Sequence, residues 1–90
     1  WKSVREFVSK MDKGARVLDI GCGCGNTTLS IAEKIKPTGR VTGLDISEPM
    51  LQRARESARE LSLENTFFQF LLKKDYTQFQ SSLKKDLVQI

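Results

Sequence analysis

The sequence predicts an α/β fold in which parallel strands are joined by helices. Short apolar runs alternate along the chain with stretches whose apolar residues recur at helical spacing. Strands joined by helical crossovers run parallel, with right-handed connections. The 90 residues contain no repeat and no Pro- or Ser-rich linker, so we expect a single domain over residues 1–90. Because the chain opens with Trp1 and has no initiator Met, we expect this domain to be a truncated part of a longer protein.

The first part of the chain predicts a helix, a strand and a glycine-rich loop, in that order. The apolar stripe of the helix, expected over residues 1–13, consists of Val4, Phe7, Val8 and Met11. Residues 16–20 are a short apolar run between glycines, which is typical of a buried strand. Gly21, Gly23 and Gly25 then alternate with two cysteines in a loop whose compactness requires glycine.

Two more helices and three more strands are expected after this loop. Residues 28–35 carry a second helical stripe, and residues 40–46 predict the second strand. Ser47 can cap the third helix, whose expected apolar face consists of Leu51, Ala54, Ala58 and Leu61. Residues 67–72 predict the third strand and residues 86–90 the start of a fourth, whereas residues 73–85 show no clear pattern.

Composition and charge exclude several classes of protein. Lys and Arg total 15 against 11 acidic residues, a net charge of +4, and no apolar run is long enough to span a membrane. The outer face of the third helix carries Arg53, Arg55, Glu56, Arg59 and Glu60. These mixed signs predict a solvated surface rather than a nucleic-acid patch. No targeting pattern is visible, and we expect a cytoplasmic protein.

Cys22 and Cys24 do not predict a metal centre or a disulfide. The C-x-C spacing is too tight for an ordinary disulfide, and no other Cys or His exists to complete a zinc site. The absence of His also excludes catalysis by a Ser-His or Cys-His pair. We therefore interpret both cysteines as small loop residues of a reduced protein.

Asp19 indicates what the glycine loop binds. The loop reads G-x-G-x-G rather than the dinucleotide fingerprint G-x-G-x-x-G, because Asn26 stands where the third glycine would fall. A carboxylate two residues before the loop suits a cationic ligand such as S-adenosylmethionine, whereas it would repel the phosphates of NAD. A second carboxylate, Asp45, ends the next strand about 20 residues beyond the loop, a spacing that suits the ribose hydroxyls of either ligand.

Residues 17–25 and 41–51 together resemble class I S-adenosylmethionine-dependent methyltransferases. The resemblance is closest to the group that includes quinone-biosynthesis and small-molecule methyltransferases. It implies a Rossmann-like three-layer α-β-α fold with a parallel sheet, present in part, in which the strand order is 3-2-1-4 and later strands are missing. The cofactor contacts that it implies are Asp19, Gly21, Gly23 and Gly25 for the methionine part, Asp45 for the ribose, and Ile46 and Met50 for the adenine.

The same family places an acid after the third strand, where it bonds the adenine amino group. Asp75-Tyr76 is the candidate here, although Lys73-Lys74 replaces the usual small residues and an ordinary loop acid is the alternative. No catalytic residue is assigned, because the cofactor carries its own leaving group and the protein mainly orients it. No metal ligand is assigned either, since no further Cys or His could complete a zinc site.

The predicted function is therefore the cofactor-binding half of a methyltransferase whose acceptor is a small molecule. Two alternatives remain open from the sequence: an NAD-dependent oxidoreductase fragment, and a catalytically inactive methyltransferase-like binding module. We expect the 90 residues alone to transfer no methyl group. We also expect self-association through the exposed fourth strand, since unpaired strand edges invite pairing.

Overall fold

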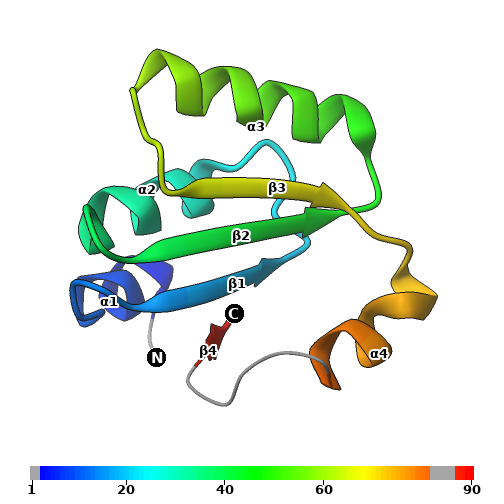
Figure 1. Ribbon diagram of the computed structural model, residues 1–90, viewed down its shortest axis with the longest axis horizontal. Coiled ribbons are helices and arrows are strands. Elements are labelled where there is room, and N and C mark those ends of the chain that lie inside the picture. The colour runs from blue at the N-terminus through cyan, green and yellow to red at the C-terminus, as the bar shows by residue number, and fades with distance from the viewer. Residues whose placement is uncertain (1–2, 82–86) are drawn as a thin grey trace.

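A four-stranded parallel sheet organises the computed structural model, which describes residues 3–81 and 87–90 (Figure 1). The strand order β3-β2-β1-β4 confirms the expected 3-2-1-4 order, and all three strand pairs are parallel. In chain order the elements are α1 (Val4–Ser9), β1 (Arg16–Ile20), α2 (Asn26–Ile35), β2 (Arg40–Asp45), α3 (Glu48–Glu60), β3 (Thr66–Phe70), the 3-10 helix η1 (Lys73–Asp75), α4 (Tyr76–Ser81) and β4 (Leu87–Gln89).

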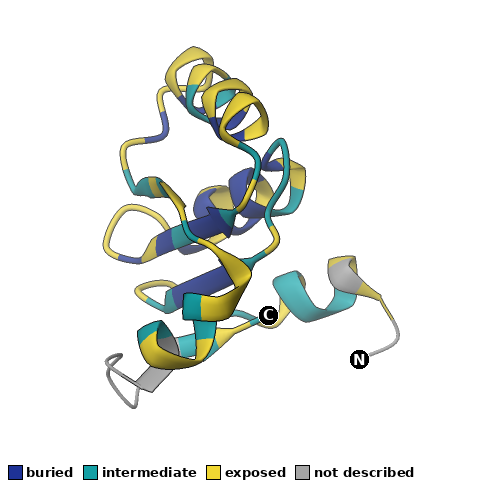
Figure 2. Ribbon diagram, turned by 90° about the vertical axis from the view of Figure 1, so that its right-hand side faces the viewer, coloured by how far each residue is buried: buried dark blue, intermediate teal, exposed yellow. Residues whose placement is uncertain are grey.

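Helices lie on both faces of the sheet, so the predicted three-layer architecture is confirmed in partial form. Figures 1 and 2 place α4 on the opposite side of the sheet from α1 and α2. Because β1 and β3 both run parallel to β2, the carboxyl ends of these three strands lie at the same edge of the sheet. We call this the carboxyl edge, and it carries the glycine loop.

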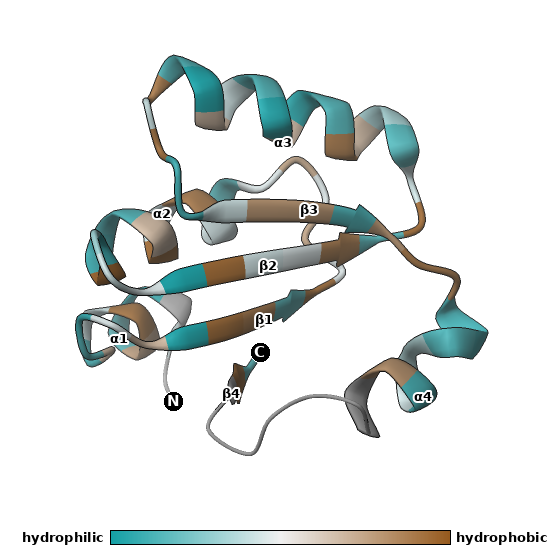
Figure 3. Ribbon diagram, in the orientation of Figure 1, coloured by the Kyte–Doolittle hydropathy of each residue, from teal (hydrophilic) through white to brown (hydrophobic). Residues whose placement is uncertain are grey.

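The core lies between the sheet and α2 and α3. Its buried members are Val17, Leu29, Ile31, Ala32, Ile35, Val41, Ala58 and Leu63. Figure 3 shows the apolar stretches of β1 and β2, and the few apolar positions of α3 turned toward the sheet. Ser47 caps α3 as predicted, since its hydroxyl accepts a hydrogen bond from the backbone N–H of Met50.

Four sequence predictions about the elements need correction. The first helix ends at Ser9 and not at residue 13, because the chain turns toward Gly14, whose φ is +91°; Met11 still packs against the core. Leu61 is 59% exposed, since α3 ends at Glu60 before its side chain can face the sheet. The second strand ends at Asp45, and the third covers residues 66–70 because the chain leaves the sheet for η1.

The C-terminal fifth of the chain forms two short helices and the fourth strand. Residues 73–81, which showed no clear periodicity, form η1 and α4. The fourth strand covers Leu87–Gln89, while Asp86, its predicted first residue, lies outside the described residues. In the part of the chain that the structure describes, no helix is long and apolar enough to cross a membrane.

Candidate functional site

The glycine loop between β1 and α2 adopts a conformation that only glycine tolerates easily. Gly21, Gly23 and Gly25 have φ angles of +74°, +58° and +87°. A Cβ added at Gly21 would meet nothing within 4 Å, and one at Gly23 would meet only the Sδ of Met50 at 3.8 Å. The loop therefore presents bare backbone on a side that is open to a ligand.

The end of β2 holds the glycine loop in place. The carbonyl oxygen of Leu44 accepts hydrogen bonds from the backbone N–H groups of Gly21 (2.7 Å) and Cys22 (3.0 Å). Asp45 Oδ2 accepts from the N–H of Gly23 at 2.8 Å, and Asp45 Oδ1 accepts from the N–H of Ser47 at 2.9 Å. The Asp45 carboxylate thus joins the loop to the start of α3, at the position where the sequence predicted a ligand-binding acid.

Asp19 is a buried carboxylate beneath this loop. It is 7% exposed, and its Oδ2 accepts a hydrogen bond from the Thr28 hydroxyl at 2.5 Å. Burial raises the pKa of Asp19, and the nearby negative charge of Asp45 raises it further, while the Thr28 hydrogen bond lowers it. Within the described residues no Lys or Arg forms an ion pair with Asp19. Such a carboxylate favours a cationic ligand.

The first turn of α2 adds hydrogen-bond donors beside Asp19. Gly25 is the N-cap of this helix and provides no side-chain cap. The backbone N–H groups of the first turn have no partner within the helix, and they carry the positive end of its dipole. The site therefore offers a buried carboxylate for a cation and a helix terminus for an anion.

Apolar side chains complete the carboxyl edge of the sheet. Ile46 follows β2, Met50 lies in the first turn of α3, Phe70 ends β3 and Leu72 follows it; each is between 44% and 58% exposed. Exposed apolar groups gathered beside polar ones are typical of ligand sites. Their position next to the glycine loop suits a flat, partly apolar ligand group.

Tyr76 lies close to the same edge, and the placement of Asp75 is less informative. Burial raises the pKa of Tyr76, the charge of Asp45 raises it further, and Cys22 adds to the effect once its thiol is ionised. Tyr76 is therefore within electrostatic range of the loop and of β2. Asp75 ends η1, and its backbone N–H donates to the carbonyl of Leu72. No contact that the structure describes joins its carboxylate to the loop, so its role stays a prediction.

Sequence reasoning missed two polar residues of this region. Thr28 appeared only as part of a helical stripe, yet it is fully buried and bonds Asp19. A hydroxyl on an otherwise apolar helix face, just beyond a buried acid and a loop, was the available signal. Arg55, expected on a solvated face, instead donates to Glu48 and to the carbonyl of Phe68, each at 2.8 Å.

Cys22 fills the space above a glycine of β2. A Cβ at Gly43 would meet Cys22 Sγ at 2.8 Å and the ring of Phe68 at 3.0 Å, so the loop and the sheet interlock there. Burial, followed by the charges of Asp19 and Asp45, raises the pKa of Cys22 to about 12. The thiol is therefore protonated at neutral pH and is a poor nucleophile or metal ligand.

We expect Cys22→Ala and Cys24→Ala to retain ligand binding, and metal chelation to leave folding unchanged. Among the described residues, no cluster of three or more His, Cys, Asp or Glu could hold a metal ion. Calorimetry should show a Kd within about threefold of the original, since about 1.4 kcal/mol is needed for a tenfold change. Stoichiometric zinc in purified protein would contradict this prediction.

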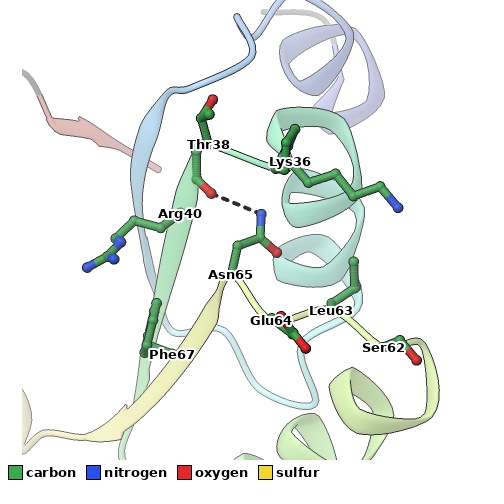
Figure 4. Close-up of a pocket in the computed structure, with 10 residues that line it drawn as sticks. Lys36, Thr38, Arg40, Ser62, Leu63, Glu64, Asn65 and Phe67 are labelled. Atoms are coloured by element: carbon green, nitrogen blue, oxygen red, sulfur yellow. Dashed lines mark hydrogen bonds between the residues drawn. The ribbon is translucent and has the colours of Figure 1, made fainter.

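A separate cavity lies at the opposite, amino-terminal edge of the sheet (Figure 4). It measures about 350 Å³ and is lined by residues 36–40, 62–65 and Phe67. Asn65 Nδ2 donates there to the carbonyls of Ala32 and Gly39, both at 3.0 Å, while its Oδ1 is buried without a partner. Because Asn65 Oδ1 is buried, it is not exposed to a ligand in the cavity. Asn65 thus ties α2 to β2, and the cavity is not part of the candidate site.

Comparison with known proteins identifies the family of this chain. The sequence model of the family described as "Methyltransferase domain" matches residues 11–88. The chain belongs to this family. It is a class I S-adenosylmethionine-dependent methyltransferase domain, and S-adenosylmethionine is its cofactor. This result decides against the NAD-dependent oxidoreductase that the sequence alone left open.

Relatives of this methyltransferase domain act on different kinds of acceptor. A demethylmenaquinone methyltransferase of Listeria welshimeri is 42% identical over 65 residues, which cover 72% of this chain and 28% of the relative. A 23S rRNA (uracil(1939)-C(5))-methyltransferase of Acinetobacter baylyi is 45% identical over 69 residues, covering 76% of this chain and 15% of the relative. The chain thus spans under a third of the length of these relatives.

A solved structure supports the fold of the methyltransferase domain. A SAM-dependent methyltransferase from Aquifex aeolicus superposes with a TM-score of 0.71 at 23% identity, covering 79% of this chain and 39% of that one. At this level of identity the likeness establishes the shared fold alone.

Proposed function

We propose that residues 1–90 form one domain that binds S-adenosylmethionine within a longer methyltransferase acting on a small molecule. One observation carries the proposal: carboxylates from two neighbouring parallel strands, Asp19 and Asp45, converge on the glycine loop. The residues proposed to contact the cofactor are Asp19, Gly21, Gly23, Gly25, Asp45, Ile46, Met50, Asp75 and Tyr76.

The methionine part of the cofactor fits the region around Asp19. Its ammonium matches a buried carboxylate that forms no ion pair among the described residues. Its carboxylate matches the first turn of α2, where Gly25 provides no side-chain cap. The glycines let the ligand approach the backbone closely, because Gly21 has open space beside it.

The nucleoside part fits the apolar half of the carboxyl edge. Asp45 is half-buried, and each of its oxygens accepts one backbone hydrogen bond, which leaves further lone pairs for ribose hydroxyls. Ile46 and Met50 expose apolar surface beside it for the adenine ring. Tyr76 approaches the same place, and Asp75 is the proposed acceptor for the adenine amino group.

The domain acts by orienting its cofactor. S-adenosylmethionine supplies an activated methyl group on its sulfonium, with the thioether as leaving group. The chain contributes the two carboxylates, the loop backbone and the helix terminus, which fix the direction of the methyl group. Mixed charges on α3, where Arg55 is already bonded to Glu48, support a small-molecule acceptor over a nucleic acid.

Two further parts of the proposal concern assembly and location. β4 lies at an edge of the described sheet, which supports the expected self-association through its unpaired backbone groups. A cytoplasmic location is proposed from the sequence, in which no targeting pattern is visible.

Calorimetry with S-adenosylhomocysteine and with NADH tests the cofactor assignment. We expect S-adenosylhomocysteine to bind more tightly, because it brings an ammonium to Asp19, whereas NADH brings two phosphates. S-adenosylhomocysteine carries the same amino-acid and nucleoside groups without the reactive methyl, so binding is measured apart from turnover. Tighter binding of NADH would overturn the proposed site.

A further inference from the structure

Thr28 is a polar residue in the core that the proposed cofactor contacts do not include. It lies in the first turn of α2 and is 0% exposed, whereas its neighbours on the same helix face are apolar. Its hydroxyl donates to Asp19 Oδ2 at 2.5 Å. A buried hydroxyl costs free energy unless it is hydrogen-bonded, so this contact accounts for its presence there.

The hydrogen bond fixes one oxygen of Asp19 and leaves the other available. Asp19 Oδ1 forms no hydrogen bond within the described chain, and it does not belong to the buried atoms without a partner. It is therefore not sealed inside the core. The Asp19 carboxyl plane is set by Thr28 from α2, while the strand β1 sets the position of its Cα.

The groups around Asp19 make this single donor important. The negative charge of Asp45, from β2, acts on Asp19 in the same direction as burial, and both raise its pKa. Cys22, from the glycine loop, is also within electrostatic range but is protonated at neutral pH. Of the side chains around Asp19 that the structure describes, Thr28 is the one that lowers its pKa. Without its hydroxyl, the protonated form would persist to higher pH.

We propose that Thr28 is a positioning residue for the cofactor, whose hydroxyl holds Asp19 through Oδ2 so that Oδ1 is left for the cofactor's ammonium. This inference rests on the proposed role of Asp19 and extends it to a residue that would not touch the ligand. Thr28→Val tests it well, because valine has nearly the same shape and lacks the donor.

The measurement is the pH dependence of S-adenosylhomocysteine binding by calorimetry between roughly pH 4 and pH 7, a range that begins near the ordinary pKa of a carboxyl group and ends below that of an α-amino group. Affinity should fall as the pH falls through the raised pKa of Asp19, because a protonated carboxyl no longer attracts the ammonium. In Thr28→Val this fall should move upward by about one to two pH units, the shift expected for one lost hydrogen bond to a charged group. At the pH of the original midpoint the affinity should be several-fold lower.

Three controls separate positioning from packing. Thr28→Ser keeps the hydroxyl and should restore the original pH profile, even though it removes a core methyl. Ser30→Ala removes a hydroxyl of α2 that donates to the Asn26 carbonyl and not to Asp19, and should leave the profile unchanged. Methylthioadenosine lacks the amino-acid group, so its affinity should be the same for the original chain and Thr28→Val.

The outcomes distinguish this inference from the proposed function. If S-adenosylhomocysteine binds the original chain and Thr28→Val leaves its pH profile unmoved, Thr28 has only a packing role. If the original chain fails to bind S-adenosylhomocysteine, the proposed function itself is wrong. Should Thr28→Val fail to fold, a shifted profile in Thr28→Ser would contradict the inference, and an unshifted profile together with a flat one in Asp19→Asn would support it.

Discussion

Gly25→Ala should destabilise the domain by roughly 2 to 6 kcal/mol. Gly25 has a φ of +87°, and an L residue held there is strained by about 1 to 3 kcal/mol. Its new Cβ would also lie 2.9 Å from the Cβ of Ala54 and 3.3 Å from the ring of Phe68. Overpacking a well-filled core costs about 1 to 3 kcal/mol more. Urea unfolding followed by circular dichroism measures the free energy of unfolding directly.

Gly21→Ala is the matched control for this prediction. Gly21 has a similar φ of +74°, but a Cβ there would meet nothing within 4 Å. Its substitution should therefore cost only the backbone strain, about 1 to 3 kcal/mol. Adding Ala54→Gly to Gly25→Ala should recover part of the loss by removing the closest atom. Equal destabilisation by the two alanine variants would show that crowding of the new Cβ by Ala54 and Phe68 contributes nothing.

Most helices and strands could be predicted from local sequence, because residues that end or cap an element stand next to it in the chain. The strand over residues 16–20 was predicted with the bounds that the structure has, since glycines stand on both sides of it. The start of α3 followed from the capping hydroxyl of Ser47. The sheet order required the family resemblance, because local patterns do not specify which strands are neighbours.

The boundaries that failed depend on tertiary structure. Leu61 continues the helical spacing of the apolar face of α3, but the helix ends one residue earlier, at Glu60. Its side chain is therefore exposed. Met11 reaches the core from outside the helix that was expected to contain it. Residues 73–81 form two short helices whose mostly polar sequence shows no apolar stripe.

The candidate site also contains some features that local sequence predicts and others that depend on tertiary structure. Asp19 and the glycines could be found by their spacing, because they lie within one strand–loop–helix unit. The bond between Gly23 and Asp45 links residues 22 positions apart and depends on β1 and β2 being neighbours. The hydrogen bond from Thr28 to Asp19 could not be predicted for a different reason. The position of Thr28 in the helical stripe already explained its burial, so no further role was assigned to its hydroxyl.

Asp45→Ala should weaken S-adenosylhomocysteine binding by roughly one to two decades, and no other single change to the proposed contacts should cost more. Each lost charge-assisted hydrogen bond to a ribose hydroxyl is worth about 1.5 to 3 kcal/mol. The same substitution also removes the acceptor for the N–H groups of Gly23 (2.8 Å) and Ser47 (2.9 Å). The glycine loop would then lose its tether to α3, which adds to the loss. Calorimetry on the folded variant measures the change in Kd.

Asp45→Asn separates the charge from the tether. Its remaining carbonyl oxygen can accept from one of the two backbone N–H groups, so the loop should stay closer to its original position. We expect an intermediate loss of affinity. Methylthioadenosine retains the ribose, so both Asp45 variants should weaken its binding, in contrast to Thr28→Val. Because the ribose contact and the loop tether share this one carboxylate, an unchanged Kd in folded Asp45→Ala would remove Asp45 from the ribose site and show that the loop holds its shape without it.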